Sequence, residues 1–145
     1  GAAVGGGATI LLHFDAVFIS PNTKIKYPFS ELGLAPEVGS SYLLFQALGY
    51  QQAAQLLFQS KAIDGTKYFE LGLAKYVGDD FLNQANSYAR ELKEQSLSSI
   101  IETKAILKSF MLEELAKARS METKAMKKLF GSEDNLKAVE KFFNK

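Results

Sequence analysis

The chain has 145 residues, of which 47% are hydrophobic and 23% charged, and its 17 basic and 16 acidic side chains leave a formal net charge of +1. This length and composition suit one compact domain, and the balanced charge disfavours direct binding to nucleic acid. The lack of cysteine excludes disulfides, thiolate metal sites and a cysteine nucleophile, and the single histidine, His13, disfavours a Ser-His-Asp triad or a multi-histidine metal site.

The N-terminal part predicts mixed α and β structure. The glycine triplet at residues 5–7 opens an apolar segment without a helix breaker, which predicts a short buried helix over residues 5–14. β-Branched and aromatic residues then predict a buried strand over residues 15–20, and alternation of polar and apolar residues predicts a second strand over residues 24–27, stopped by Pro28.

From residue 36 onward the hydrophobic period is helical. It predicts one helix that ends at Gly49, a second that contains residues 53–58 and a third, short helix over residues 67–71. Residues 63–66 read as a turn, and residues 73–77 can return as a strand.

The C-terminal part is predicted to be entirely helical. An amphipathic helix follows a cap at Asp79 or Asp80, and three more helices are expected around residues 97–109, 112–130 and 132–143, the last capped by Ser132. We therefore divide the chain into a core over residues 1–78 and a helical region of the same domain over residues 79–145.

Two features of the N-terminal part suggest chemistry. A glycine triplet before a helix offers free backbone N–H groups at the positive end of the helix dipole, although glycines also permit close packing and tight turns. Glu37 follows Pro36 at the start of a predicted helix, where both residues are also ordinary helix-start choices. Its neighbours would surround a general base with apolar or backbone material: Leu34, Ala35, Val38 and residues 39–41.

Together with the triplet, the run Pro-Phe-Ser-Glu-Leu-Gly-Leu-Ala-Pro-Glu-Val-Gly-Ser-Ser at residues 28–41 resembles the crotonase superfamily of enoyl-CoA hydratases and isomerases. The resemblance is to its Δ3,Δ2-enoyl-CoA isomerase branch, of the peroxisomal type. It implies an α/β fold, a crotonase-like spiral of ββα turns with a C-terminal helical trimerisation region. Because it covers only the second half of that domain, we expect the first half to be missing and the 145 residues alone to be inactive.

The resemblance also implies roles for site residues. The backbone N–H of Gly6, flanked by Gly5 and Gly7, would be one of two donors that hold the thioester oxygen as it becomes an enolate, and Phe29 would contribute to substrate binding. The second donor would lie in the first half of the domain. Glu37 would be the catalytic base.

Hydratases of the superfamily carry two glutamates, at positions where this chain has Thr9 and Phe29. Hydration needs one group to activate water and another to deliver a proton, whereas one base can move a proton from C2 to C4. We therefore predict isomerisation of 3-enoyl thioesters to 2-trans-enoyl thioesters. Glu31 is the rival carboxylate, with a surface or hydrogen-bonding role expected.

For the remaining polar residues the predictions are structural. His13 is expected to be a packed core histidine, and Asp15 is expected to hold a turn by accepting from backbone N–H groups. Apolar stretches are shorter than the roughly 20 residues that cross a bilayer, so no membrane contact is expected.

The resemblance implies an acyl-CoA substrate, no metal or redox cofactor, with coenzyme A entering only as part of the substrate, and a homotrimer. Family isomerases are peroxisomal or mitochondrial, although this chain ends without a Ser-Lys-Leu signal. A non-catalytic acyl-CoA-binding module, like the crotonase-like domain of chromodomain Y-like corepressors, is the main alternative. A hydratase or thioesterase of the same fold is the second, disfavoured by Thr9 and Phe29.

Overall fold

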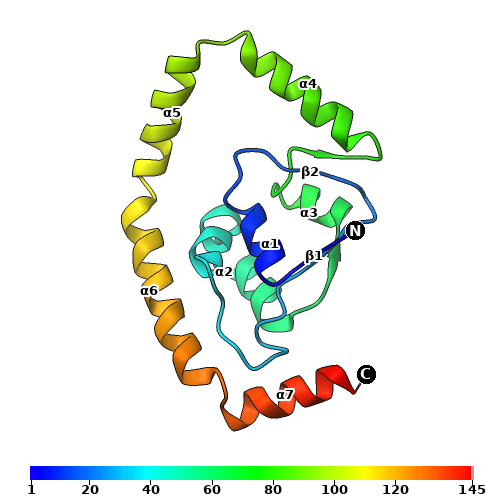
Figure 1. Ribbon diagram of the computed structural model, residues 1–145, viewed down its shortest axis with the longest axis vertical. Coiled ribbons are helices and arrows are strands. Elements are labelled where there is room, and N and C mark those ends of the chain that lie inside the picture. The colour runs from blue at the N-terminus through cyan, green and yellow to red at the C-terminus, as the bar shows by residue number, and fades with distance from the viewer. Residues whose placement is uncertain (145) are drawn as a thin grey trace.

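The computed structural model describes residues 1–144, in which two small sheets are surrounded by helices (Figure 1). One sheet has the order β1-β3-β4, with β1 parallel to β3 and β4 antiparallel to it; the other pairs β2 with β5 in parallel. The strands are β1 (Ala2–Val4), β2 (Phe18–Ile19), β3 (Lys24–Lys26), β4 (Ile63–Asp64) and β5 (Tyr76–Val77).

The core lies between these sheets and the helices α1 (Gly6–Leu11), α2 (Ser40–Gln59) and α3 (Gly65–Glu70). Burial raises the pKa of Tyr27 and of Tyr68, so both phenols stay neutral in the core. The buried cluster consists of Ala8, Ile19, Ile25, Tyr27, Phe29, Leu44, Ala53 and Tyr68.

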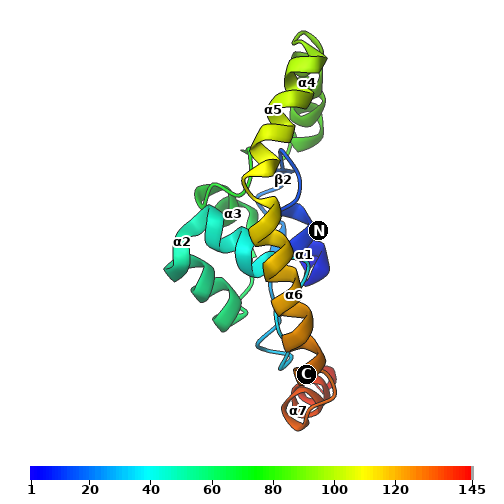
Figure 2. The ribbon, with the colours of Figure 1, turned by 90° about the vertical axis from the view of Figure 1, so that its left-hand side faces the viewer.

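The remaining helices form an arc around one side of the core (Figure 1). They are α4 (Phe81–Lys93), α5 (Leu97–Ser109), α6 (Leu112–Leu129) and α7 (Glu133–Phe143). Turned by 90°, the arc is seen edge-on as a narrow column, and its helix α6 lies beside α2 (Figure 2). At its C-terminal end, Asn135 of α7 donates a hydrogen bond to the carbonyl of Leu32 at 2.7 Å, which ties the arc back to the core.

The helical tail was the best predicted part. The helix over residues 97–109 has the predicted bounds, the next ends one residue early at Leu129, and Ser132 caps α7 by accepting from the N–H of Asn135 at 3.3 Å. Asp80 precedes α4 as expected, but its carboxylate accepts from the side chains of Asn83 and Gln84 rather than from the backbone.

The predictions were less accurate where a strand needs a distant partner. The strands predicted over residues 15–20 and 24–27 shrink to β2 and β3, and β1 and β4 were not predicted. The strands have only two or three residues, so cross-strand pairing rather than local pattern defines them.

The two helices predicted on either side of Gly49 are confirmed, since the stretch labelled α2 consists of two helical segments that meet at a kink there. Gly49 has φ 73° and ψ 169°, a conformation outside the helical region that glycine tolerates. The expected helix start near Pro36 was wrong, because α2 begins only at Ser40, after two left-handed residues. Glu37 therefore lies in the loop before α2.

The arc exposes many large apolar side chains. Helix α5 has no buried residue, and Phe110, just after it, is 77% exposed. Among residues 1–144, no helix is both long and apolar enough to span a bilayer. Apolar exposure on this scale marks an interaction surface. The exposed large apolar side chains between residues 97 and 112 are Leu97, Ile101, Ile106, Leu107, Phe110 and Leu112.

Expressed alone, residues 1–145 should therefore self-associate and bind the dye ANS, as measured by light scattering and fluorescence. Replacing Leu107 and Phe110 by polar residues should reduce the dye signal. A monodisperse monomer that unfolds cooperatively without binding dye would contradict this expectation.

Candidate active site

The fold brings Glu37 to the N-terminal end of α1. A Cβ atom built on Gly6, the first residue of that helix, would lie 3.2 Å from Oε1 of Glu37. The equivalent positions at Gly5 and Gly7 have nothing within 4 Å. The carboxylate thus lies against Gly6, the middle residue of the triplet.

Two N–H groups of the triplet are available at this helix end. The N–H of Gly5 donates to the carbonyl of Lys26 at 3.0 Å, so it is already occupied. Within residues 1–144 the N–H groups of Gly6 and Gly7 donate no hydrogen bond, and both residues are exposed. Gly5 itself has φ 57° and ψ −123°, a conformation that favours glycine. Gly6 and Gly7 therefore offer donors beside the Glu37 carboxylate.

Glu37 is followed by two consecutive left-handed residues. Val38 has φ 54° and Gly39 has φ 82°. This backbone region is unfavourable for a β-branched residue such as Val38, and strain of this kind costs on the order of 1–3 kcal/mol. Such strain persists only where surrounding contacts fix the conformation, and two side chains from distant parts of the chain supply these contacts.

The first contact is made by His13. Its Nε2 donates to the carbonyl oxygen of Val38 at 2.8 Å, since a carbonyl can only accept. His13 is half-buried, so the prediction of a packed core histidine was wrong. Sequence reasoning missed the contact because Val38 is 25 residues away.

The second contact is made by Glu122 of α6, which is 6% exposed. Its Oε2 accepts from the N–H of Gly39 at 2.6 Å, and its Oε1 accepts from the N–H and the hydroxyl of Ser41 at 2.9 and 2.6 Å. Nothing local in the sequence singled out Glu122, which reads as one more acidic residue on an amphipathic helix. The first turn of α2 is capped from 83 residues away.

A cavity of about 300 Å³ adjoins Glu37 between the loop and α6. Acidic, basic and apolar side chains all line this cavity, so its lining alone does not indicate one class of ligand. The lining residues are Pro36, Glu37, Val38, Arg119, Glu122, Thr123, Met126 and Lys127.

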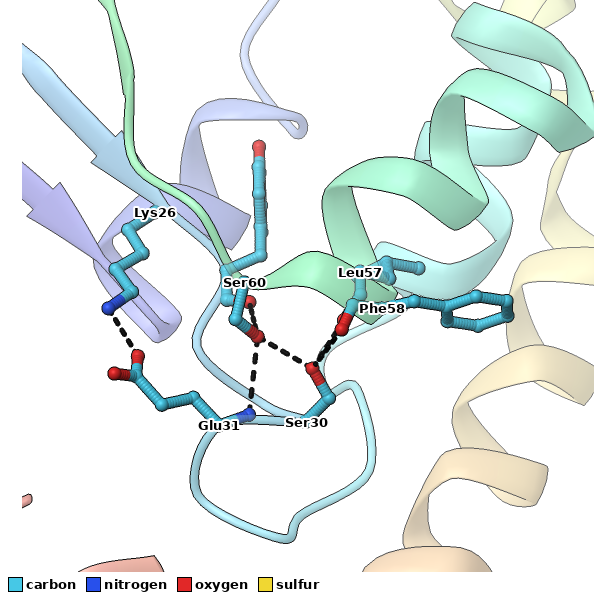
Figure 3. A network of polar contacts seen from close by, with 7 residues as sticks. Lys26, Ser30, Glu31, Leu57, Phe58 and Ser60 are labelled. Atoms are coloured by element: carbon cyan, nitrogen blue, oxygen red, sulfur yellow. Dashed lines mark hydrogen bonds and ion pairs between the residues drawn. The ribbon is translucent and has the colours of Figure 1, made fainter. Parts of the chain in front are cut away.

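The rival carboxylate, Glu31, belongs to a separate network at the other end of α2 (Figure 3). Its side chain pairs with Lys26, and its N–H donates to Oγ of Ser60 at 3.3 Å. Ser30 beside it donates to carbonyl oxygens in the last turn of α2 at 2.8 and 3.0 Å. Glu31 thus stands in a network that closes the C-terminal end of α2.

The other predicted residues lie apart from the carboxylate and its donors. Phe29 is 4% exposed and packs in the core, which favours a packing role over direct substrate contact. Asp15 forms an ion pair with Lys104 of α5, so the prediction that it holds a turn by accepting from backbone N–H groups was wrong. Within residues 1–144 there is no cluster of three or more potential metal-ligating side chains.

Comparisons with known proteins show the family of the chain. The sequence profile of the enoyl-CoA hydratase/isomerase family matches residues 1–145. The chain belongs to the enoyl-CoA hydratase/isomerase family. The predicted crotonase-like α/β fold is confirmed, since solved structures of enzymes in this family superpose on the chain.

Three similar proteins illustrate the family. YhaR of Bacillus subtilis, named as an enoyl-CoA hydratase/isomerase, is 30% identical over 147 residues that cover all of this chain and 57% of that protein. The structure of Pseudomonas aeruginosa OdaA is 34% identical, with a TM-score of 0.93 over 100% of this chain and 60% of that one. Mouse peroxisomal enoyl-CoA delta isomerase 3 is 38% identical over 77 residues, 53% of this chain and 24% of that protein.

The chain spans less than two thirds of the length of these family members. Several of its relatives are named enoyl-CoA hydratases, and the isomerase-named match covers only about half of the chain. The family is thus established, whereas the choice between hydratase and isomerase depends on the residues of this chain.

The geometry of Gly39 gives a stability prediction for this family member. In Gly39→Ala the new Cβ would lie 2.3 Å from Cδ1 of Leu115 at a residue with φ 82°, so we expect a loss of about 1–3 kcal/mol in the free energy of unfolding. Gly7→Ala is the control, because its Cβ meets nothing within 4 Å and alanine favours the helix by about 1 kcal/mol. Thermal unfolding of both variants should give shifts of opposite sign; equal shifts would refute the account.

Proposed function

We propose that this protein is a Δ3,Δ2-enoyl-CoA isomerase that converts 3-enoyl thioesters into 2-trans-enoyl thioesters. The observation that carries the proposal is the position of the Glu37 carboxylate against Gly6, whose N–H is free within the described chain. A base next to a backbone donor at a helix start can remove a proton and stabilise the negative charge that results.

The proposed reaction needs one carboxylate. Glu37 removes a proton from C2 of the 3-enoyl thioester, and the electron pair moves into a dienolate whose oxygen accepts from the N–H of Gly6. The protonated Glu37 then returns the proton at C4, and the double bond settles between C2 and C3. Proton and electrons balance, because the carboxylate is regenerated and no redox partner takes part.

Two buried side chains argue against hydration. Thr9 is 0% exposed and Phe29 is 4% exposed, and these are the positions at which the resemblance placed the two hydratase glutamates. Neither side chain can act as a carboxylic acid or carboxylate. Within residues 1–144, Glu37 supplies the one carboxylate that lies against Gly6. In this part of the chain the site therefore offers a single base and no second carboxylate of the hydratase kind.

Several parts of the proposal concern the whole protein. We propose that a second oxyanion donor and most contacts to coenzyme A come from the part of the family domain that this chain does not span, and that the helical arc takes part in a homotrimer. A peroxisomal or mitochondrial location is proposed on the partial similarity to the mouse peroxisomal isomerase. The proposal includes no metal or redox cofactor.

In the full-length protein that contains this chain, Glu37→Gln should lower the rate of 3-enoyl to 2-enoyl conversion by at least about 100-fold, because an amide cannot accept the proton. The free energy of unfolding should stay within about 1 kcal/mol, since the side chain is only half-buried. Glu31→Gln is the matched control and should retain activity. Retained activity in Glu37→Gln with loss in Glu31→Gln would overturn the assignment, and tight acyl-CoA binding without turnover in the wild type would favour the non-catalytic module.

The same wild-type protein should hydrate 2-enoyl-CoA far more slowly than it isomerises 3-enoyl-CoA, because no acid-base pair stands at Thr9 and Phe29. Parallel assays for the 3-hydroxyacyl and the 2-enoyl products measure this ratio. Hydration as fast as isomerisation would identify the protein as a hydratase.

A further inference from the structure

We propose that Glu122 holds the left-handed turn, the two consecutive residues Val38 and Gly39 with positive φ, and thereby positions the carboxylate of Glu37. This inference rests on the proposed role of Glu37 as the base. Glu122 touches neither Gly6 nor the proposed reacting atoms through any described bond, so its role is that of a positioning residue.

All three hydrogen bonds of the contact need an acceptor oxygen on the side chain of residue 122. Two oxygens of Glu122 accept three hydrogen bonds, from the N–H of Gly39 and from the N–H and hydroxyl of Ser41. All three partners are donors, so a glutamine would set its own NH₂ group against one of them. A buried charge bound to backbone N–H groups makes short, strong hydrogen bonds, and a negative charge also complements the N-terminal dipole of α2.

The position of the contact links it to Glu37. Gly39, which is bound to Glu122, follows Glu37 by two residues, and the intervening Val38 has the strained φ of 54°. Gly39 also packs against α6, because a Cβ at this residue would lie 2.3 Å from Cδ1 of Leu115 and 3.6 Å from Cγ of Arg119. Helix α6 thus fixes Gly39, the second residue of the left-handed turn.

His13 fixes Val38, the first residue of the turn, because its Nε2 donates to the carbonyl oxygen of Val38. His13 belongs to the segment that follows α1. His13, two residues after the end of α1, and Glu122 of α6 therefore bind the same peptide group, the one that joins Val38 to Gly39. Releasing the Glu122 contact lets Val38 and Gly39 relax toward unstrained conformations, and the Glu37 carboxylate then moves relative to Gly6. A displacement of about 1 Å at a reacting group can lower a rate about 100-fold.

The test compares three variants of the full-length protein in the isomerase assay. Glu122→Gln should lower kcat by about 10- to 100-fold with KM changed less than about twofold, because orientation and not binding is lost. Ser41→Ala, which removes only one of the three bonds, should have a smaller effect on kcat. Glu113→Gln, an exposed residue in the first turn of the same helix, is the matched control and should behave as the wild type.

Hydrogen-deuterium exchange provides a readout that does not depend on the reaction. The amides of Gly39 and Ser41 should exchange faster in Glu122→Gln than in Glu113→Gln, while the buried core amides remain protected. Unchanged exchange at these amides, or a kcat of Glu122→Gln within twofold of the wild type while Glu37→Gln is inactive, would overturn the inference. If Glu37→Gln stayed active, the proposed function would fail, and the exchange result would still decide whether Glu122 holds the loop.

Discussion

The arrangement of the site depends on a left-handed turn of two residues, Val38 and Gly39, directly before α2. The turn ends the loop that carries Glu37 and leads directly into α2. Valine resists this conformation, so the turn needs external support. Hydrogen bonds from His13 and to Glu122 provide that support, and the carboxylate of Glu37 comes to lie against Gly6 as a result.

This dependence explains which parts of the site the sequence could predict. Glycines before an apolar helix, and a glutamate after proline, leave a local signal, and the structure brings Gly6 and Glu37 together. Glu122 leaves none, because its partners lie 81 to 83 residues away and its helix looks like any amphipathic segment. The start of α2 was misplaced because proline and an acidic residue, as at positions 36 and 37, normally open a helix. The distant contact of Glu122 that caps α2 at Gly39 gave no local signal against that reading.

The fold shows the same division. Helices α5, α6 and α7 were predicted within one residue at each end, because caps and hydrophobic period are encoded locally. The strands contain two or three residues each and exist only through pairing with segments far along the chain, such as β2 with β5. The break within α2 at Gly49 belongs with the helices, because the glycine that divides its two helical segments is a local signal and was predicted.

Membership of the enoyl-CoA hydratase/isomerase family leaves two reactions open, and the number of carboxylates at the site separates them. In the proposed isomerase reaction one base, Glu37, carries one proton from C2 to C4. The most direct test supplies the full-length protein with 3-enoyl-CoA deuterated at C2 and follows the label by mass spectrometry and NMR. We expect deuterium at C4 of the 2-enoyl product; a product whose C4 hydrogen comes only from solvent, accompanied by 3-hydroxyacyl-CoA, would contradict transfer by a single base.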